Sequence, residues 1–151
     1  MKTIIFLLAL AAWLVVGSPV HAVSLLSEVT PTNLKAAGFT IAITHERLPD
    51  GAAKFRVVIT EKDGTFCSNP STVLSTVKVT ETSSSITGGR ALPFDKQGHS
   101  IVCVFTVSKD SLEAPDFCFV FTNYVERVVD GKLISAPSAD FVYARLKDFA
   151  H

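Results

Sequence analysis

Cysteine and histidine are the residue types in this sequence that could support nucleophilic chemistry. A thiolate nucleophile needs a neighbouring base and a lowered pKa. His99 begins the predicted strand that contains Cys103, but residues four apart on a strand are separated by about 13 Å, so these two side chains cannot meet. No recognisable motif surrounds the remaining candidates, which are Cys67, Cys118, His45 and His151. We therefore assign no catalytic residue and expect a protein that is not an enzyme.

A disulfide is the other chemistry open to the cysteines. Cys103 and Cys118 lie in two strong predicted strands that flank one short connection, and a hairpin would place them nearly opposite each other. In facing sheets, both side chains would instead have to point inward, yet Cys118 alternates out of phase with its phenylalanine neighbours. The alternative is that all three thiols are small buried hydrophobic groups. We expect a Cys103–Cys118 disulfide, because such bonds persist in oxidising compartments.

Metal and cofactor chemistry is not expected. The histidines are scattered and no Cys-x-x-Cys motif is present, which argues against zinc and copper sites. No window shows the alternating acids of a calcium loop, and no phosphate-binding loop motif occurs. The segment Gly88-Gly89-Arg90 could face an anion, although a glycine pair is usually a flexible turn. We therefore expect neither a metal nor a cofactor.

The first 22 residues have the layout of a secretory signal peptide. A basic start at Lys2 precedes an unbroken apolar run over residues 4–16, and small residues stand before a cleavage point between Ala22 and Val23. The run is shorter than the about 20 residues that a membrane span needs. We expect cleavage at this point, export to the periplasm or the outside of the cell, and no membrane span afterwards.

The composition indicates one globular domain over residues 23–151. The chain has 151 residues, 48% of them hydrophobic, and its 14 basic residues balance its 14 acidic ones. This balance is too apolar for a disordered chain. It also provides no basic excess for binding nucleic acid.

Short runs of alternating apolar and polar residues, typical of half-buried strands, fill most of this domain. Residues 39–43 and 55–59 alternate around a Leu-Pro-Asp-Gly turn at 48–51, which predicts a hairpin. Asp130-Gly131 predicts a second hairpin, because this dipeptide suits a type I′ turn. The other expected strands cover residues 23–29, 73–82, 100–107, 117–124 and 141–146.

One short helix is expected after the first strand. Thr30 suits the N-cap, Pro31 suits the first helical position, and Gly38 suits the C-terminal stop. A helix capped by Ser138 and running to residue 149 is the alternative to the final strand.

These elements predict an all-β fold, an antiparallel β-sandwich with one short N-terminal helix. The spacing of Leu112, Pro115, Phe117, Phe119 and Phe121 resembles the corner between the fifth and sixth strands of fibronectin type III and other immunoglobulin-like domains. Phe117 stands where those families often carry a tyrosine. The resemblance implies an immunoglobulin-like sandwich and implies no function.

Residues 101–107 and 117–121 are apolar on both faces of their predicted strands, whereas one face of an antiparallel sheet is usually polar. Other segments could cover the second face. Alternatively, it forms an exposed patch that binds a partner. The candidate patch consists of Val102, Val104, Cys118, Val120 and Tyr124.

Three functions follow from these observations. The first is an exported, non-catalytic β-sandwich that acts by protein–protein contact, with an unknown partner or with itself. The second is a module that binds a small ligand or glycan through loops such as 87–90 or 94–99. A small hydrolase ranks last.

Overall fold

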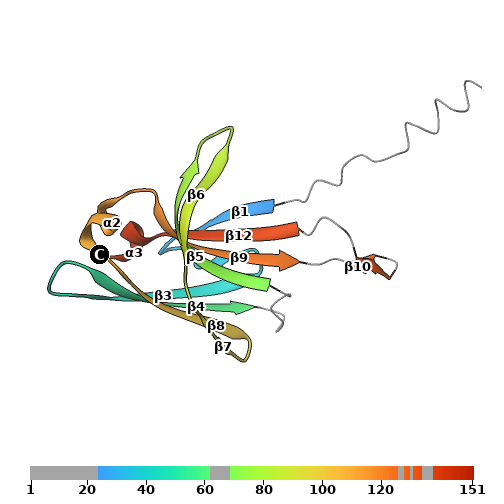
Figure 1. Ribbon diagram of the computed structural model, residues 1–151, viewed down its shortest axis with the longest axis horizontal. Helices are drawn as coiled ribbons and strands as arrows, with labels where there is room; N and C mark the ends of the chain where they lie inside the picture. Colours follow the sequence, from blue (N-terminus) through green and yellow to red (C-terminus); the bar gives the residue numbers. More distant parts are fainter. Residues whose placement is uncertain (1–23, 62–68, 126–127, 130, 134–137) are drawn as a thin grey trace, which may run out of the picture.

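Two five-stranded sheets make up most of the computed structural model, which describes residues 24–61, 69–125, 128–129, 131–133 and 138–151 (Figure 1). In spatial order, the first sheet contains β1 (Ser24–Val29), β12 (Ser138–Arg145), β9 (Phe117–Val125), β5 (Asn69–Val79) and β6 (Ser84–Ala91). The second sheet contains β2 (Lys35–Ala36), β3 (Phe39–Arg47), β4 (Ala53–Glu61), β8 (Ser100–Val107) and β7 (Asp95–Gln97). Neighbouring strands are antiparallel, except for the parallel pair β1–β12. The expectation of an all-β fold is confirmed.

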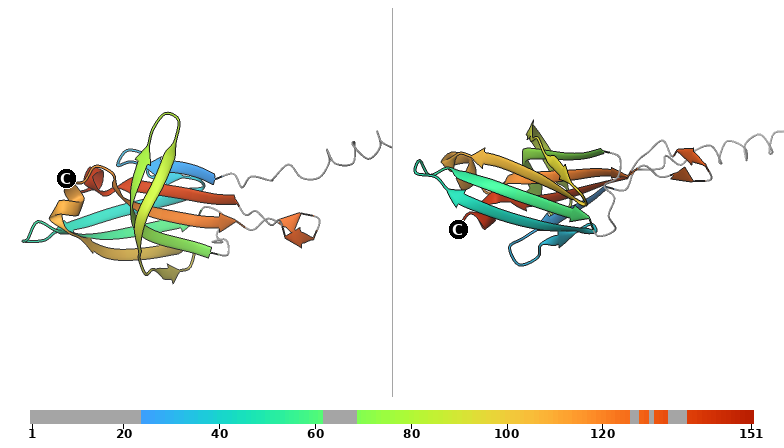
Figure 2. Two further views of the ribbon diagram at one scale, coloured as in Figure 1. Left: turned by 45° about the horizontal axis from the view of Figure 1, so that its top comes forward. Right: turned by 90° about the horizontal axis from the view of Figure 1, so that it is seen from below.

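The two sheets face each other across a core built around phenylalanine rings. Phe39 of β3 meets Phe121 of β9 edge-on, with 5.0 Å between ring centroids. Phe105 of β8 stacks on Phe119 of β9 at 5.6 Å. Such aromatic pairs contribute about 0.5–1.5 kcal/mol each beyond their burial. These two contacts join the sheets, and Figure 2 shows the resulting two layers.

Strict alternation in β3 and β4 explains their hairpin. The β4 residues Phe55, Val57 and Ile59 are fully buried, while their neighbours Lys54 and Arg56 are exposed. At the turn, the Leu48 N–H donates to the Ala52 carbonyl at 2.9 Å, and Gly51 adopts φ +82°. A left-handed glycine after a tight turn is typical of three-residue hairpin loops. The predicted turn at 48–51 is confirmed.

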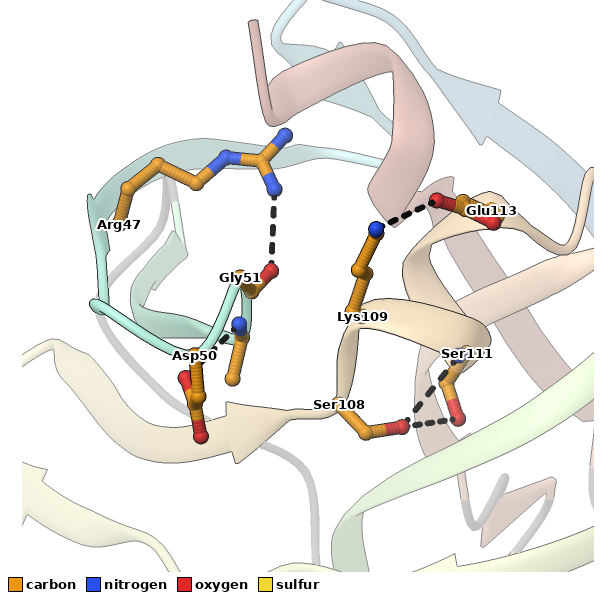
Figure 3. A network of polar contacts seen from close by, with 8 residues as sticks. Arg47, Asp50, Gly51, Ser108, Lys109, Ser111 and Glu113 are labelled. Atoms are coloured by element: carbon orange, nitrogen blue, oxygen red, sulfur yellow. Dashed lines mark hydrogen bonds and ion pairs between the residues drawn. The ribbon is translucent and has the colours of Figure 1, made fainter.

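The same turn helps to close one end of the sandwich, together with α2 (Lys109–Glu113) and α3 (Leu146–Phe149). Arg47 donates to the Ala150 carbonyl at 2.6 Å and to the Gly51 carbonyl at 3.3 Å. A Cβ at Gly51 would lie 3.0 Å from the Lys109 side chain, so the turn and α2 are in contact (Figure 3). Leu112 of α2 and Leu146 of α3 are buried in the core beneath these polar contacts.

The helix expected after residue 30 is wrong. Thr30 and Asn33 pair through two backbone hydrogen bonds, and the chain then forms β2. Ala37 and Gly38 both have positive φ, +50° and +82°, so they form a two-residue hairpin loop of type I′ geometry between β2 and β3. The Thr30 hydroxyl still accepts a hydrogen bond from the Asn33 N–H at 3.1 Å, as an N-cap would, but the turn that it stabilises does not continue into a helix.

Both C-terminal strand predictions are confirmed. Residue 129 of β10 (Val128–Val129) pairs with residue 132 of β11 (Lys132–Leu133), and Gly131 has φ +73°. The final strand is β12, and only its last turn continues as the one-turn helix α3, so the alternative helix over residues 138–149 is wrong.

The strands expected from sequence do not include residues 84–91, which form the edge strand β6. All eight of its residues are exposed, so it has no alternation of buried and exposed positions. Its Gly88-Gly89 pair, expected as a flexible turn, forms a bulge instead: the register with β5 shifts between Leu74 and Thr76.

The predicted signal peptide and its Ala22–Val23 cleavage point lie outside the described residues. Within the part of the chain that is described, no helix is long and apolar enough to cross a membrane.

Truncating the central ring of the core should be strongly destabilising. Phe119 is fully buried and stacks across the sheet interface, so we expect Phe119→Ala to lower the free energy of unfolding by about 3–5 kcal/mol. Urea unfolding followed by circular dichroism measures this loss. The exposed Thr40→Ala control should lose less than about 1 kcal/mol, and equal losses would show that the sheets do not meet at Phe119.

Candidate functional site

The two strands that carry the predicted site residues lie in different sheets. β8 pairs with β4 and β7, whereas β9 pairs with β12 and β5. Since Cys103 and Phe119 both point into the core, Val102 and Val104 point out of the second sheet, and Cys118 and Val120 point out of the first. The candidate patch is therefore divided between opposite faces of the sandwich.

Burial also differs among the members of this patch. Val102 is 7% exposed and Val120 2%, and Cys118 is fully buried in a second apolar cluster with Val77 and Tyr143. Of the patch members whose side chains are described, only Val104 is exposed, at 47%. Tyr124 belongs to β9, but its side chain lies outside the described part of the structure. The single exposed patch expected from sequence does not form from these residues, because other side chains cover the outer face of the first sheet.

The expected Cys103–Cys118 disulfide is also wrong. Both cysteines are free and buried. The Cys103 thiol points inward and donates to the Pro93 carbonyl at 3.1 Å, whereas the Cys118 thiol lies on the outer face and donates to the Asp116 carbonyl at 3.3 Å. A whole sheet therefore separates the two side chains. Cys67 lies outside the described residues.

Both thiols have a raised pKa. Burial raises the pKa of Cys118 from 9.0 to about 12, against the opposing effect of the Arg145 charge. Burial also raises the pKa of Cys103, which a hydrogen bond with Thr72 partly offsets. A thiol that stays protonated at neutral pH is a poor nucleophile. These two positions therefore behave as small hydrophobic residues.

The exposed surface that the sequence did not reveal is the hairpin of β5 and β6. In Figure 1 it rises beyond the other strands of the first sheet. Its tip is fixed by a turn in which the Thr80 N–H donates to the Ser83 carbonyl at 2.7 Å and the two hydroxyls lie 2.8 Å apart. Val79 and Ile86, 46% and 38% exposed, lie on the same face of this hairpin as buried Val77.

A cleft of about 580 Å³ lies on the inner side of the same hairpin, between β6 and the end of β8; we call it the β6–β8 cleft. Its β5–β6 wall contains Leu74, Ser75, Thr76 and residues 87–90, and its opposite wall contains residues 106–108, Ser111 and Phe117. Among the described residues, the sequence-predicted ligand loop at 87–90 thus lines a concave site. The second loop named from sequence, at 94–99, is not part of it.

The Gly88-Gly89 bulge shapes the wall of this cleft. Gly88 has φ +68°, and a Cβ at Gly89 would lie 2.9 Å from a Val73 methyl group, so both positions favour glycine. The Ser75 hydroxyl lies 3.0 Å from the Thr87 carbonyl and 2.9 Å from the Gly88 carbonyl. These contacts fix the backbone from which Arg90 extends.

No group of three or more histidine, cysteine, aspartate or glutamate side chains in the described ranges could hold a metal ion. No protein-family model matches this chain, and neither a curated protein nor a solved structure matches it.

A charge at position 120 should unfold the protein, while the same charge at position 104 should be tolerated. Val120→Lys would place an unpaired ammonium in the apolar cluster around Cys118, and we expect a loss of more than about 3 kcal/mol in the free energy of unfolding. Val104→Lys, on the exposed outer face of the second sheet, should cost less than about 1 kcal/mol. Urea titrations compare the free energies of unfolding of the two variants. Similar losses in both would contradict the assignment of positions 120 and 104 to a covered and an exposed face.

The buried Cys118 thiol should make stability fall at alkaline pH. A group whose pKa is raised by folding contributes stability that is complete below its unfolded pKa, here 9.0, and is lost as pH rises toward its folded pKa of about 12. Urea unfolding at pH 8, 9 and 10 should therefore show a steeper loss for the wild type than for Cys118→Ala. If both proteins lose stability equally with rising pH, the Cys118 thiol ionises as easily in the folded state as in the unfolded state.

Proposed function

We propose that this protein is a non-catalytic, exported β-sandwich that acts by protein–protein contact, and that its partner is a second copy paired along β6. The single observation that carries the proposal is the exposed edge of β6 in a hairpin that projects from the sandwich (Figure 1). Export rests on the signal-like layout of residues 1–22. The protonated state of the two described thiols supports a non-catalytic role.

An edge strand presents unpaired backbone N–H and C=O groups to any extended segment. Among the four edge strands of the two sheets, β2 has two residues and β7 three, which leaves little backbone to pair, and β1 has six residues, of which Glu28 carries a charge that is paired with Arg145. β6 has eight residues, and its stretch before the glycine bulge, Ser84 to Thr87, contains no charge and no proline. The usual devices that prevent edge pairing are thus missing from this stretch.

Residues 84–87 of one copy can pair with the same residues of a second copy. In an antiparallel two-fold pairing centred on Ile86, the two Ile86 side chains would lie directly opposite each other, with Cβ atoms about 4.5–5.5 Å apart. Serine and threonine flank them, so no like charges would meet. The contact would also cover Ile86, one of the exposed large hydrophobic residues in the described ranges. The first sheets of the two copies would then join into one continuous sheet.

A relationship to immunoglobulin or fibronectin type III domains is a separate proposal, based on the corner residues between Leu112 and Phe121. The strand order supports it. The order β3-β4-β8-β7 corresponds to A-B-E-D and the order β5-β9-β12 to C-F-G, so the consecutive strands β4 and β5 lie in opposite sheets, as strands B and C do in the immunoglobulin fold.

Self-association should be lost when a charge is placed on the edge. We expect sedimentation velocity over a concentration series to show a monomer–dimer equilibrium for the wild type. Ile86→Lys should remain a monomer, because two ammonium groups would face each other across the pairing.

Val104→Lys is the matched control, since it changes a β-branched residue that is even more exposed than Ile86, on the outer face of the second sheet, and it should leave the dimer intact. A wild type that is monomeric at every concentration would refute the proposal. A dimer disrupted by Val104→Lys and not by Ile86→Lys would also refute it and would assign the contact to the second sheet.

A further inference from the structure

We propose that the β6–β8 cleft binds an acidic sugar, with Arg90 holding its carboxylate or sulfate group. This site is independent of the proposed contact along the outer edge of β6. It lies on the inner side of the strand, where Arg90 stands opposite Leu74 in the register and therefore points toward the second sheet.

The charge of the cleft favours an anionic ligand. Among the described residues, Arg90 is the only ionisable one that lines the cleft, and none of them brings a carboxylate that would compete with an anionic ligand. Its guanidinium makes no ion pair with a described residue, and its only protein hydrogen bond among those residues is a long one, 3.5 Å to the Thr106 carbonyl. A guanidinium offers five N–H donors in a fork that fits a carboxylate or sulfate with two parallel bonds.

The hydroxyl groups of the cleft favour a sugar. Residues with hydroxyl side chains line both walls of the cleft: Ser75, Thr76, Thr87, Thr106, Ser108 and Ser111. The Ser75 hydroxyl is already engaged by the Thr87 and Gly88 carbonyls. Ser108 and Ser111 hydrogen-bond each other at 3.0 Å (Figure 3), while the Thr87 and Thr106 hydroxyls have no side-chain partner among the described residues. Such groups can donate to and accept from the hydroxyls of a sugar.

The size and lining of the cleft suit a sugar ring. The volume of about 580 Å³ falls within the range of small-molecule sites. More of the lining surface is apolar than polar, and Leu74, Val107 and Phe117 contribute apolar surface for the C–H groups of a sugar ring, while seven of the twelve lining residues carry polar side chains. An apolar ligand would leave these hydroxyls and Arg90 without partners, which is costly. The lining thus selects a ligand that combines hydroxyls with a negative charge.

The bulge makes this arrangement rigid before a ligand binds. The Ser75 contacts with the Thr87 and Gly88 carbonyls hold the backbone next to Arg90. A donor set that is held in place loses less conformational entropy on binding.

Titrations followed by ¹⁵N–¹H correlation spectra test the proposal with three probes: D-glucuronate, D-glucose and sodium sulfate. D-glucuronate should shift the amides of residues 87–90 and 106–111, D-glucose should not, and sulfate should bind more weakly than D-glucuronate. In Arg90→Gln the dissociation constant for D-glucuronate should rise roughly tenfold, as expected for the loss of a charged hydrogen bond.

Arg56→Gln is the matched control, because Arg56 is an exposed arginine of β4 on the outer face of the second sheet, and it should bind D-glucuronate as the wild type does. Arg90→Lys keeps the charge without the fork and should bind with intermediate affinity. The spectra themselves report whether each variant is folded. The proposal fails if D-glucuronate produces no shifts at the cleft, if D-glucose or sulfate binds as well as D-glucuronate, or if Arg90→Gln binds unchanged.

Discussion

The contact of phenylalanine rings across the two sheets is the constraint on which the rest of the structure depends. Phe119 and Phe121 of β9 reach Phe105 and Phe39 of the second sheet, which fixes the inward face of β9. Because side chains alternate along a strand, Cys118 must then point outward. Alternation along β8 directs Cys103 inward, because Phe105, two residues later, points into the core. The separation of the two thiols, and the burial that keeps them protonated, follow from this one packing arrangement.

The sequence predicts strands well and sheet membership poorly. Alternation and turn chemistry identify the β3–β4 and β10–β11 hairpins, because both signals depend on neighbouring residues. Nothing local tells whether β8 and β9 pair or face each other, since α2 carries the chain from one sheet to the other. The expected N-terminal helix fails for a similar reason: Thr30 does act as a local cap, but a hairpin with positive φ at Ala37 replaces the helix.

The candidate site was only partly predictable. The sequence singles out residues 87–90 because a Gly-Gly-Arg segment can face an anion, and these residues line the β6–β8 cleft. The edge strand itself could not be recognised, because all eight residues of β6 are exposed and none of the usual alternation results. Its two sides offer different interactions. The outer side presents backbone groups beside Ile86, and the inner side presents Arg90 and hydroxyls, so a partner chain and a small ligand could occupy β6 together.

Two copies of this protein are proposed to meet along the free edge of β6. Hydrogen–deuterium exchange, measured over a series of protein concentrations, is the most direct test of this contact. The amides of β4 and β9 lie in the interior of their sheets and serve as internal references. If two copies pair along β6, exchange in residues 84–87 slows as concentration rises, well beyond any change in the references, because edge pairing protects backbone N–H groups. Exchange in residues 84–87 that is independent of concentration would contradict this pairing.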